Sequence, residues 1–263
     1  MLESFRDHWP EYGLEALGLG IFMVSACLFT ALLEYPASPL FTFLPNDLYR
    51  RLIIGIAMGL TAIGIIYSPI GKRSGAHMNP AVTITFFRLG KIRGPDALFY
   101  SLFQTLGGAL GVFLTALVIR TWIAHPAVNY AVTIPGPLGV GAALVAEFVI
   151  SFGLMMAVLV FSNSPHWSRW TGVAAGILIA LYVALEAPLS GMSMNPARTV
   201  ASAINARVYS SLWIYFVAPP LGMLLAAEVF VRSRGVARVL CAKLNPDTHE
   251  RCIFLCRFGG FGS

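Results

Sequence analysis

Six long apolar runs dominate this sequence, at about residues 12–33, 52–69, 96–119, 138–161, 170–188 and 212–231. A helix needs about 20 apolar residues to cross the hydrocarbon core of a bilayer, so each run predicts a membrane span. Only 11% of the residues are charged, whereas a soluble domain carries about 25%. We therefore expect an all-α membrane protein with six transmembrane helices, forming one domain over residues 1–263.

Glycine pairs four residues apart recur inside these runs. The pairs are Gly55 with Gly59, Gly107 with Gly111 and Gly172 with Gly176. Small residues at this spacing allow the backbones of two helices to approach closely in lipid. The spans are therefore predicted to pack as one bundle.

A ten-residue polar segment occurs twice in this apolar chain. SGAHMNPAVT at 74–83 returns as SGMSMNPART at 190–199, with seven identical positions. Each copy lies between the second and third spans of one half of the chain, at about 10–122 for the first repeat and 138–232 for the second. Because each half holds three spans, the second half enters the membrane from the opposite face, and we expect an inverted 3+3 repeat.

Each segment predicts a short helix after its asparagine. Asn79 and Asn195 are favourable N-cap residues, and the proline that follows each suits the first helical position. Helices over 80–87 and 196–205 would each be ~15 Å long, about half of the hydrocarbon thickness. We expect two half-spanning re-entrant helices that meet N-terminus to N-terminus near the midplane.

The loop before each asparagine must be non-helical at the depth of the membrane centre. Such backbone is tolerated only where it is buried in protein or lines a watery cavity. Two positive helix ends and a row of carbonyls at the centre of a bundle predict a narrow polar pore. Glu15 and Glu147 lie inside spans, where a carboxylate needs hydrogen-bonding partners.

Basic residues indicate the orientation of the chain. Six spans put both termini on one side, and thirteen of the eighteen Lys and Arg residues fall on that side. The positive-inside rule makes it the cytoplasmic side. These residues are scattered in short connectors and in residues 233–263, so we interpret them as topology signals and expect no nucleic-acid partner.

Residues 233–263 are predicted to be a poorly ordered cytoplasmic tail that ends in FGGFGS. Three of the four cysteines lie in it, Cys241, Cys252 and Cys256, whereas Cys27 lies in the first span as a small buried residue. Free cytosolic thiols are the favoured interpretation. A zinc site that also uses His249 is the alternative, although the spacing fits no standard finger. The N-terminus lacks the features of a cleaved signal peptide.

The paired SGxxMNPA segments, the span-borne Glu15 and Glu147, Gln104 and Arg198 together resemble the aquaporin (major intrinsic protein) family over about residues 10–232, and within it a bacterial-type water channel. The resemblance implies a homotetramer in the cell (plasma or inner) membrane, with one pore per subunit. It implies passive flow of water and small neutral solutes without ions or protons. It implies neither enzyme activity nor a cofactor.

The resemblance also assigns roles. The pore midplane would be formed by Asn79, Pro80, Ala81, Asn195, Pro196 and Ala197. The pore-lining loop backbone would come from Gly75, Ala76, His77, Gly191 and Ser193. Glu15, Glu147 and Gln104 would support these loops. Each asparagine amide would donate to a passing water, and the opposed dipoles would disfavour a cation there.

The selectivity filter would lie near the outer mouth. By resemblance its four positions are Met58 or Gly59, Val183, Met192 and Arg198, and the single fixed charge would repel cations. Water-selective members tend to have His on the fifth span and an aromatic residue on the second. This chain has neither, so we expect an apolar filter that is wider than a strict water filter.

Other positions favour water. Glycerol facilitators resemble one another in an Asp after the filter arginine and a basic residue four positions later, whereas this chain has Thr199 and Ala203. The sixth span carries Tyr215 and Phe216, as water channels tend to. A glycerol or small-solute facilitator with a wide apolar filter remains the alternative.

Two titratable residues, Glu186 and His77, lie within or close to the repeated segments. Glu186 is expected at the membrane interface rather than in the vestibule, and His77 as a loop support rather than a pH gate.

A secondary transporter would need more ionisable residues at the midplane than this chain has. A poorly conducting structural membrane protein is the other alternative.

Overall fold

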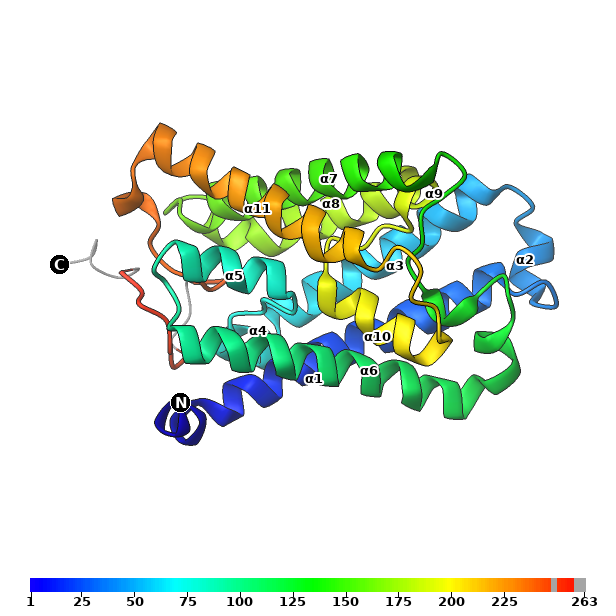
Figure 1. Ribbon diagram of the computed structural model, residues 1–263, viewed down its shortest axis with the longest axis horizontal. Helices are drawn as coiled ribbons and strands as arrows, with labels where there is room; N and C mark the ends of the chain where they lie inside the picture. The colour runs from blue at the N-terminus through cyan, green and yellow to red at the C-terminus, as the bar shows by residue number, and fades with distance from the viewer. Residues whose placement is uncertain (247–249, 258–263) are drawn as a thin grey trace.

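The computed structural model describes residues 1–246 and 250–257, and within these residues all the regular elements are helical (Figure 1). Six helical segments are long and apolar enough to cross a membrane, which confirms the six predicted spans. They are α1 (Leu2–Glu34), α3 (Asp47–Tyr67), α6 (Gly94–Ala124), α7 (Gly139–Ser162), Ser168–Leu185, which comprises a 3₁₀ turn and α8 (Thr171–Leu185), and α11 (Trp213–Arg234).

Five short helices connect or interrupt the long ones. They are α2 (Pro39–Phe43), α4 (Pro69–Ser74), α5 (Pro80–Arg88), α9 (Ala187–Ser190) and α10 (Pro196–Ala206); further 3₁₀ turns span Asn129–Ala131 and Val236–Arg238. Helices α5 and α10 begin and end within one residue of the predicted half-helices. At 1.5 Å per residue they are about 14 and 17 Å long, so that together they match the ~30 Å hydrocarbon core.

The bundle is assembled from close helix pairs. Helix α1 packs on α6 and α7 packs on α11, while α3 of the first half packs on α8 of the second. A methyl group added at Gly55 or Gly59 of α3 would lie 2.4 Å from a carbonyl oxygen of α8, and one at Gly107 of α6 would lie 2.0 Å from the carbonyl of Ala16. The predicted glycine pairs are thus contact points between helices.

The start of α1 and the end of α11 lie at the same end of the molecule, while α2 lies at the other (Figure 1). An even number of spans requires this arrangement. Helices α5 and α10 lie along the bundle between the long helices, one from each end, and their N-terminal loops meet in the middle (Figure 1).

The prediction of a poorly ordered tail is wrong for its described part, residues 235–246 and 250–257, which we call the tail segment. Residues 239–245 are buried, and so is Phe254. The backbone N–H of Leu244 donates to the Gly75 carbonyl at 3.0 Å, and that of Leu255 donates to the Lys91 carbonyl at 3.0 Å. The tail segment folds because its apolar side chains can bury themselves against the bundle, namely those of Val239, Leu240, Ala242, Leu244 and Phe254. The FGGFGS end lies outside the described residues.

The prediction of free thiols is wrong for two cysteines of the tail segment. Cys241 and Cys256 form a disulfide, while Cys252 and Cys27 are free. Cys27 is fully buried in α1, as expected. His249, the fourth member of the alternative zinc site, lies outside the described residues.

Candidate pore at the meeting point of two half-helices

A cavity of about 410 Å³ runs along the bundle between the two halves. Both loops that precede the half-helices line it, and so do side chains of α1, α3, α7 and α8. Its lining runs from Glu34 and Arg51, at the end of the bundle that holds α2, to Leu244 of the tail segment at the other. The cavity therefore extends along the direction in which the helices would cross a membrane.

The two asparagines lie at the centre of this cavity and bond crosswise. The Asn79 amide Nδ2 donates to the Met194 carbonyl at 2.7 Å, and the Asn195 amide Nδ2 donates to the Met78 carbonyl at 2.7 Å. Each Oδ1 accepts from the start of its own helix, from the N–H of Ala81 at 2.8 Å in one half. Because both ends of each amide are held, the second Nδ2 hydrogen points in a fixed direction.

The same N-cap bond recurs in the second half. The Asn195 Oδ1 accepts from the N–H groups of Ala197 at 3.0 Å and Arg198 at 3.2 Å. Pro80 and Pro196 occupy the first helical positions and are buried. The two positive helix ends thus face each other across the cavity.

The loops have an unusual backbone that turns their carbonyls. Gly75 and Gly191 adopt φ of 95° and 78°, the left-handed region that suits glycine. Ala76 and Met78 in the first loop, and Met192 and Met194 in the second, also have positive φ. Such residues cost ~1–3 kcal/mol each and persist only where surrounding bonds hold them.

Glu15 provides these bonds for the first loop. Its Oε1 accepts from Ser74 Oγ at 2.8 Å and from the N–H of His77 at 3.0 Å. Its Oε2 accepts from the N–H of Met78 at 2.5 Å and from Gln104 Nε2 at 2.7 Å. A fully buried carboxylate with four donors is a rigid anchor for the loop.

Glu147 has the equivalent position in the second half. It accepts from Ser190 Oγ at 2.6 Å, from the N–H of Ser193 at 2.7 Å and from the N–H of Met194 at 2.7 Å. Ser193 Oγ also contacts Thr199 Oγ1 at 2.6 Å. Both loops are therefore fixed by one buried carboxylate from the first helix of their own half.

The prediction of site residues missed a set of polar partners that repeats between the halves. Ser74 and Ser190 each donate to the loop glutamate. The hydroxyl of Tyr100 donates to the Ser74 carbonyl at 2.7 Å, and that of Tyr215 to the Ser190 carbonyl at 2.5 Å. The two serines are identical positions of the repeated segment, so the repeat could have identified them. Tyr215 was noted only for the solute range, and nothing in the sequence indicated Tyr100.

Three of the predicted filter side chains surround the cavity together with Arg198. Met58, Val183 and Met192 all line it, whereas Gly59 packs against the carbonyl of Gly176 in α8. The second-span position in the cavity wall is therefore Met58. Apart from the guanidinium group, this part of the wall is apolar.

Arg198 is half-buried, and within the described residues its side chain makes one hydrogen bond, from Nη1 to Ser202 Oγ at 3.5 Å. Among the described residues no carboxylate forms a salt bridge with it. Its counterpart in the first segment, Val82, also lines the cavity. Arg198 is therefore the charged side chain beside the apolar filter positions, while Glu34 and Arg51 line the cavity at the end of the bundle that holds α2.

His77 and Glu186 lie at opposite ends of the site. The His77 ring contacts Thr83 Oγ1 at 3.0 Å and the Ala242 carbonyl at 2.8 Å, and it stacks on Phe86 and Phe254. Glu186 is buried but does not line the cavity; it lies beside an apolar groove formed by α7 and the start of α9.

The model of the family described as "Major intrinsic protein" matches residues 6–230. The chain belongs to the major intrinsic protein family. It is 36% identical to a probable NIP-type aquaporin of Nicotiana alata over 71% of this chain and 67% of the relative. It is 32% identical to the aquaporin NIP2-3 of Zea mays over 97% of this chain and 81% of the relative.

A solved structure supports the fold independently. The aquaglyceroporin from Plasmodium falciparum superimposes with a TM-score of 0.70 over 84% of this chain and 94% of its own, at 20% identity. This major intrinsic protein therefore has the aquaporin fold that its repeated segments indicate. The resemblance to the aquaporin (major intrinsic protein) family is confirmed, and so is the passive channel that it implies.

Proposed function

We propose that the cavity carries water, and with it small uncharged solutes such as glycerol, while it excludes ions and protons. The observation that supports this most directly is the crosswise pair of Asn79 and Asn195 at the centre of the cavity. Each amide keeps one hydrogen for a passing oxygen. A water molecule that accepts from both amides is oriented with its own hydrogens away from the centre, which interrupts a proton-conducting chain.

Exclusion of cations follows from the charges around the path. Each helix N-terminus carries about +0.5 of an elementary charge, so the two that meet here act as roughly one positive charge. Arg198 adds a second along the path, without a carboxylate bound to it among the described residues. Both charges would repel a cation on the path, whereas neither would repel a neutral solute.

The solute range is set by the filter wall. Met58, Val183 and Met192 offer no hydrogen-bonding side-chain group, and methionine is adaptable in shape. A wall of this kind accepts the carbon backbone of a small polyol while Arg198 bonds to its hydroxyls. We therefore assign water together with small neutral solutes, rather than strict water selectivity.

The location and assembly belong to the same proposal. The distribution of basic residues supports a cytoplasmic side for both termini, and we assign the channel to the plasma or inner membrane. Four copies, each with its own pore, form the working unit. Residues 1–232 then form the channel and the remainder lies on the cytoplasmic side.

Stopped-flow light scattering of proteoliposomes tests the solute range. Val183→His adds volume and a hydrogen-bonding ring to the filter, so we expect glycerol flux to fall about tenfold or more, on the order of 1.4 kcal/mol of added barrier, while water flux persists. Val183→Thr keeps the volume and is the control, with both fluxes close to those of the unaltered chain. Equal glycerol flux in the histidine variant would remove Val183 from the filter, and no water flux above that of empty liposomes would refute the channel.

A further inference from the structure

The tail segment covers one end of the cavity. Leu244 lines the cavity, and its N–H bonds to the carbonyl of Gly75 in the first pore loop. The Ala242 carbonyl bonds to His77 at 2.8 Å, and the Phe254 ring stacks on the same histidine with centroids 5.2 Å apart. The tail segment therefore contacts the pore loop itself and lies across its path.

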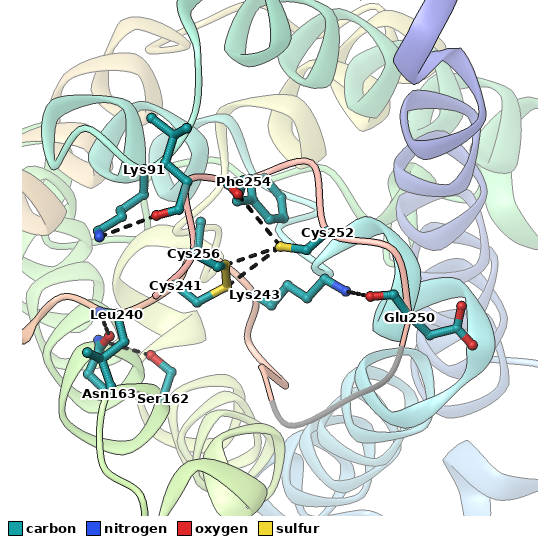
Figure 2. Close-up of a disulfide and its surroundings, with 12 residues drawn as sticks. Lys91, Ser162, Asn163, Leu240, Cys241, Lys243, Glu250, Cys252, Phe254 and Cys256 are labelled. Carbon is teal, nitrogen blue, oxygen red and sulfur yellow. Dashed lines mark hydrogen bonds between the residues drawn. A yellow bond between two sulfur atoms is a disulfide. The ribbon is translucent and has the colours of Figure 1, made fainter. Parts of the chain in front are cut away.

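The tail segment is attached to the bundle at several further points. Asn163 Oδ1, at the end of α7, accepts from the N–H of Leu240 at 2.6 Å. The N–H of Arg257 donates to the Leu240 carbonyl at 2.7 Å, which joins the two stretches of the tail segment. Figure 2 looks onto this region, with helices arranged around the labelled residues.

Three sulfur atoms converge where the two stretches meet. Cys241 and Cys256 are bonded, and the Cys252 Sγ lies 3.9 Å from the Cys241 Sγ and 3.1 Å from the Cys256 Sγ (Figure 2). All three sulfurs lie within 4.8 Å of one another. Cys241 is buried and Cys252 is exposed, so the cluster can be reached from solution.

A disulfide alone does not explain this arrangement, because it needs two cysteines and a third sulfur is directed at the pair. Three converging thiolates are a ligand set of zinc and other soft ions. With Zn–S bonds of about 2.3 Å, tetrahedral geometry places two sulfurs roughly 3.8 Å apart, which is close to the separation of Cys241 and Cys252. A cytosolic location would also keep thiols reduced.

A buried lysine fixes the backbone around the cluster. The Lys243 ammonium group donates to the carbonyls of Glu250 at 3.1 Å and Arg251 at 3.0 Å, and so fixes the backbone that leads into Cys252 (Figure 2). Lys243 is almost fully buried, and its charge lies near the cluster without a carboxylate bound to it among the described residues. The stretch that carries Cys252 is therefore held in place beside Cys241 and Cys256.

We propose that Cys241, Cys252 and Cys256 form a site for a thiophilic divalent ion of the zinc class, and that the bound ion fastens the tail segment over this mouth of the pore. A cytosolic dithiol first reduces the Cys241–Cys256 disulfide with two electrons and two protons and itself becomes a disulfide. The ion then replaces the protons of the three thiols, and water takes the fourth position. The closing of the pore rests on the proposed channel function, whereas the binding of the ion does not.

Ion binding is tested on the full-length chain in detergent. The protein is reduced with a phosphine, freed of metal with a chelator, exposed to zinc, desalted, and assayed for bound zinc by elemental analysis. We expect one zinc per chain, and its loss in Cys252→Ser, which leaves the other two cysteines in place. Cys27→Ser changes the cysteine that is distant from the tail segment and should keep the zinc. Equal zinc content in the unaltered chain and Cys252→Ser would overturn the site.

Cobalt gives a second readout that does not depend on retention during desalting. Co²⁺ in a tetrahedral thiolate site gives visible ligand-field and sulfur-to-metal absorption bands, which we expect for the reduced chain and not for Cys252→Ser. A second measurement exposes the chain to glutathione at a cytosolic ratio and counts free thiols. A disulfide that persists there would leave no site for the ion and would overturn the proposal.

The effect on flow is measured in proteoliposomes of the reduced chain by stopped-flow light scattering, with zinc or with chelator. We expect zinc to lower water permeability several-fold in the unaltered chain and to leave Cys252→Ser unchanged. Zinc that binds without changing the flow would overturn the closing role. If the chain conducts no water under any condition, the proposed function fails, and the zinc and cobalt measurements still decide the site.

Discussion

Gly59 provides a direct test of how the filter is supported. It lies next to Met58 in α3, where a methyl group would stand 2.4 Å from the carbonyl oxygen of Gly176 in α8. Ordinary contacts of such a methyl begin at 3.4 Å. Gly59→Ala therefore requires α3 and α8 to separate by about 1 Å. Gly64 lies in the same helix, and a methyl group added there would have no neighbour within 4 Å. Gly64→Ala is therefore the matched control.

The two substitutions should differ clearly in stability. Overpacking of this kind costs ~1–3 kcal/mol, while alanine in place of an exposed helical glycine gains up to ~1 kcal/mol. At about 2–4 °C per kcal/mol for a chain of this size, Gly59→Ala should lower the Tm by several degrees. Gly64→Ala should leave the Tm unchanged or raise it slightly.

The assay is thermal unfolding of the purified proteins in one detergent, followed by intrinsic tryptophan fluorescence. Glycerol flux through the same variants reports on the neighbouring Met58. If the α3–α8 contact supports the filter wall, Gly59→Ala changes glycerol flux and Gly64→Ala does not. Identical Tm values for the two variants would refute the close packing of α3 on α8.

Two further perturbations address the loops and the fixed charge. Glu147→Gln replaces an oxygen acceptor by a nitrogen donor among three buried donors, so at least one donor is left unpaired at a cost of about 1–3 kcal/mol. We expect this variant to have a lower Tm and a lower water flux. Its control is Glu228→Gln, at a partly exposed ion pair with Arg88, which should cost less than about 0.5 kcal/mol. Arg198→Val copies the first segment and removes the fixed charge, so proteoliposomes should gain proton or cation leakage, measured with a pH-sensitive dye. Arg198→Lys keeps the charge, so its proteoliposomes should show no added leakage of protons or cations. The role of Arg198 would be contradicted if the valine variant leaked no more than the lysine variant.

The spans and half-helices could be predicted because each leaves a local signal. Apolar length determines a membrane helix, and an asparagine followed by proline determines where α5 and α10 begin. The repeat identified both loops at once, and Glu15 and Glu147 were conspicuous because a charge inside a span needs a partner. The choice between Met58 and Gly59 was not accessible, because neighbouring residues of a helix differ only in the face they present.

The tail segment could not be predicted from its sequence. It has no helical or strand period, and its apolar residues are too few to indicate burial by themselves. Its folded form depends on contacts with distant residues such as Gly75, Lys91 and Asn163. The convergence of its cysteines follows from those contacts, since Cys241 is separated from Cys256 by 15 residues.

The crosswise bonds of Asn79 and Asn195 also bear on how the chain assembles. Each asparagine bonds to a carbonyl 115 or 117 residues away, in the opposite half of the chain. Neither loop can satisfy its buried groups while the other half is absent. Although the first half is synthesised first, its re-entrant loop therefore cannot complete its hydrogen bonds until the second half has entered the bundle. We conclude that the part of the pore around the two asparagines forms only when the two halves dock.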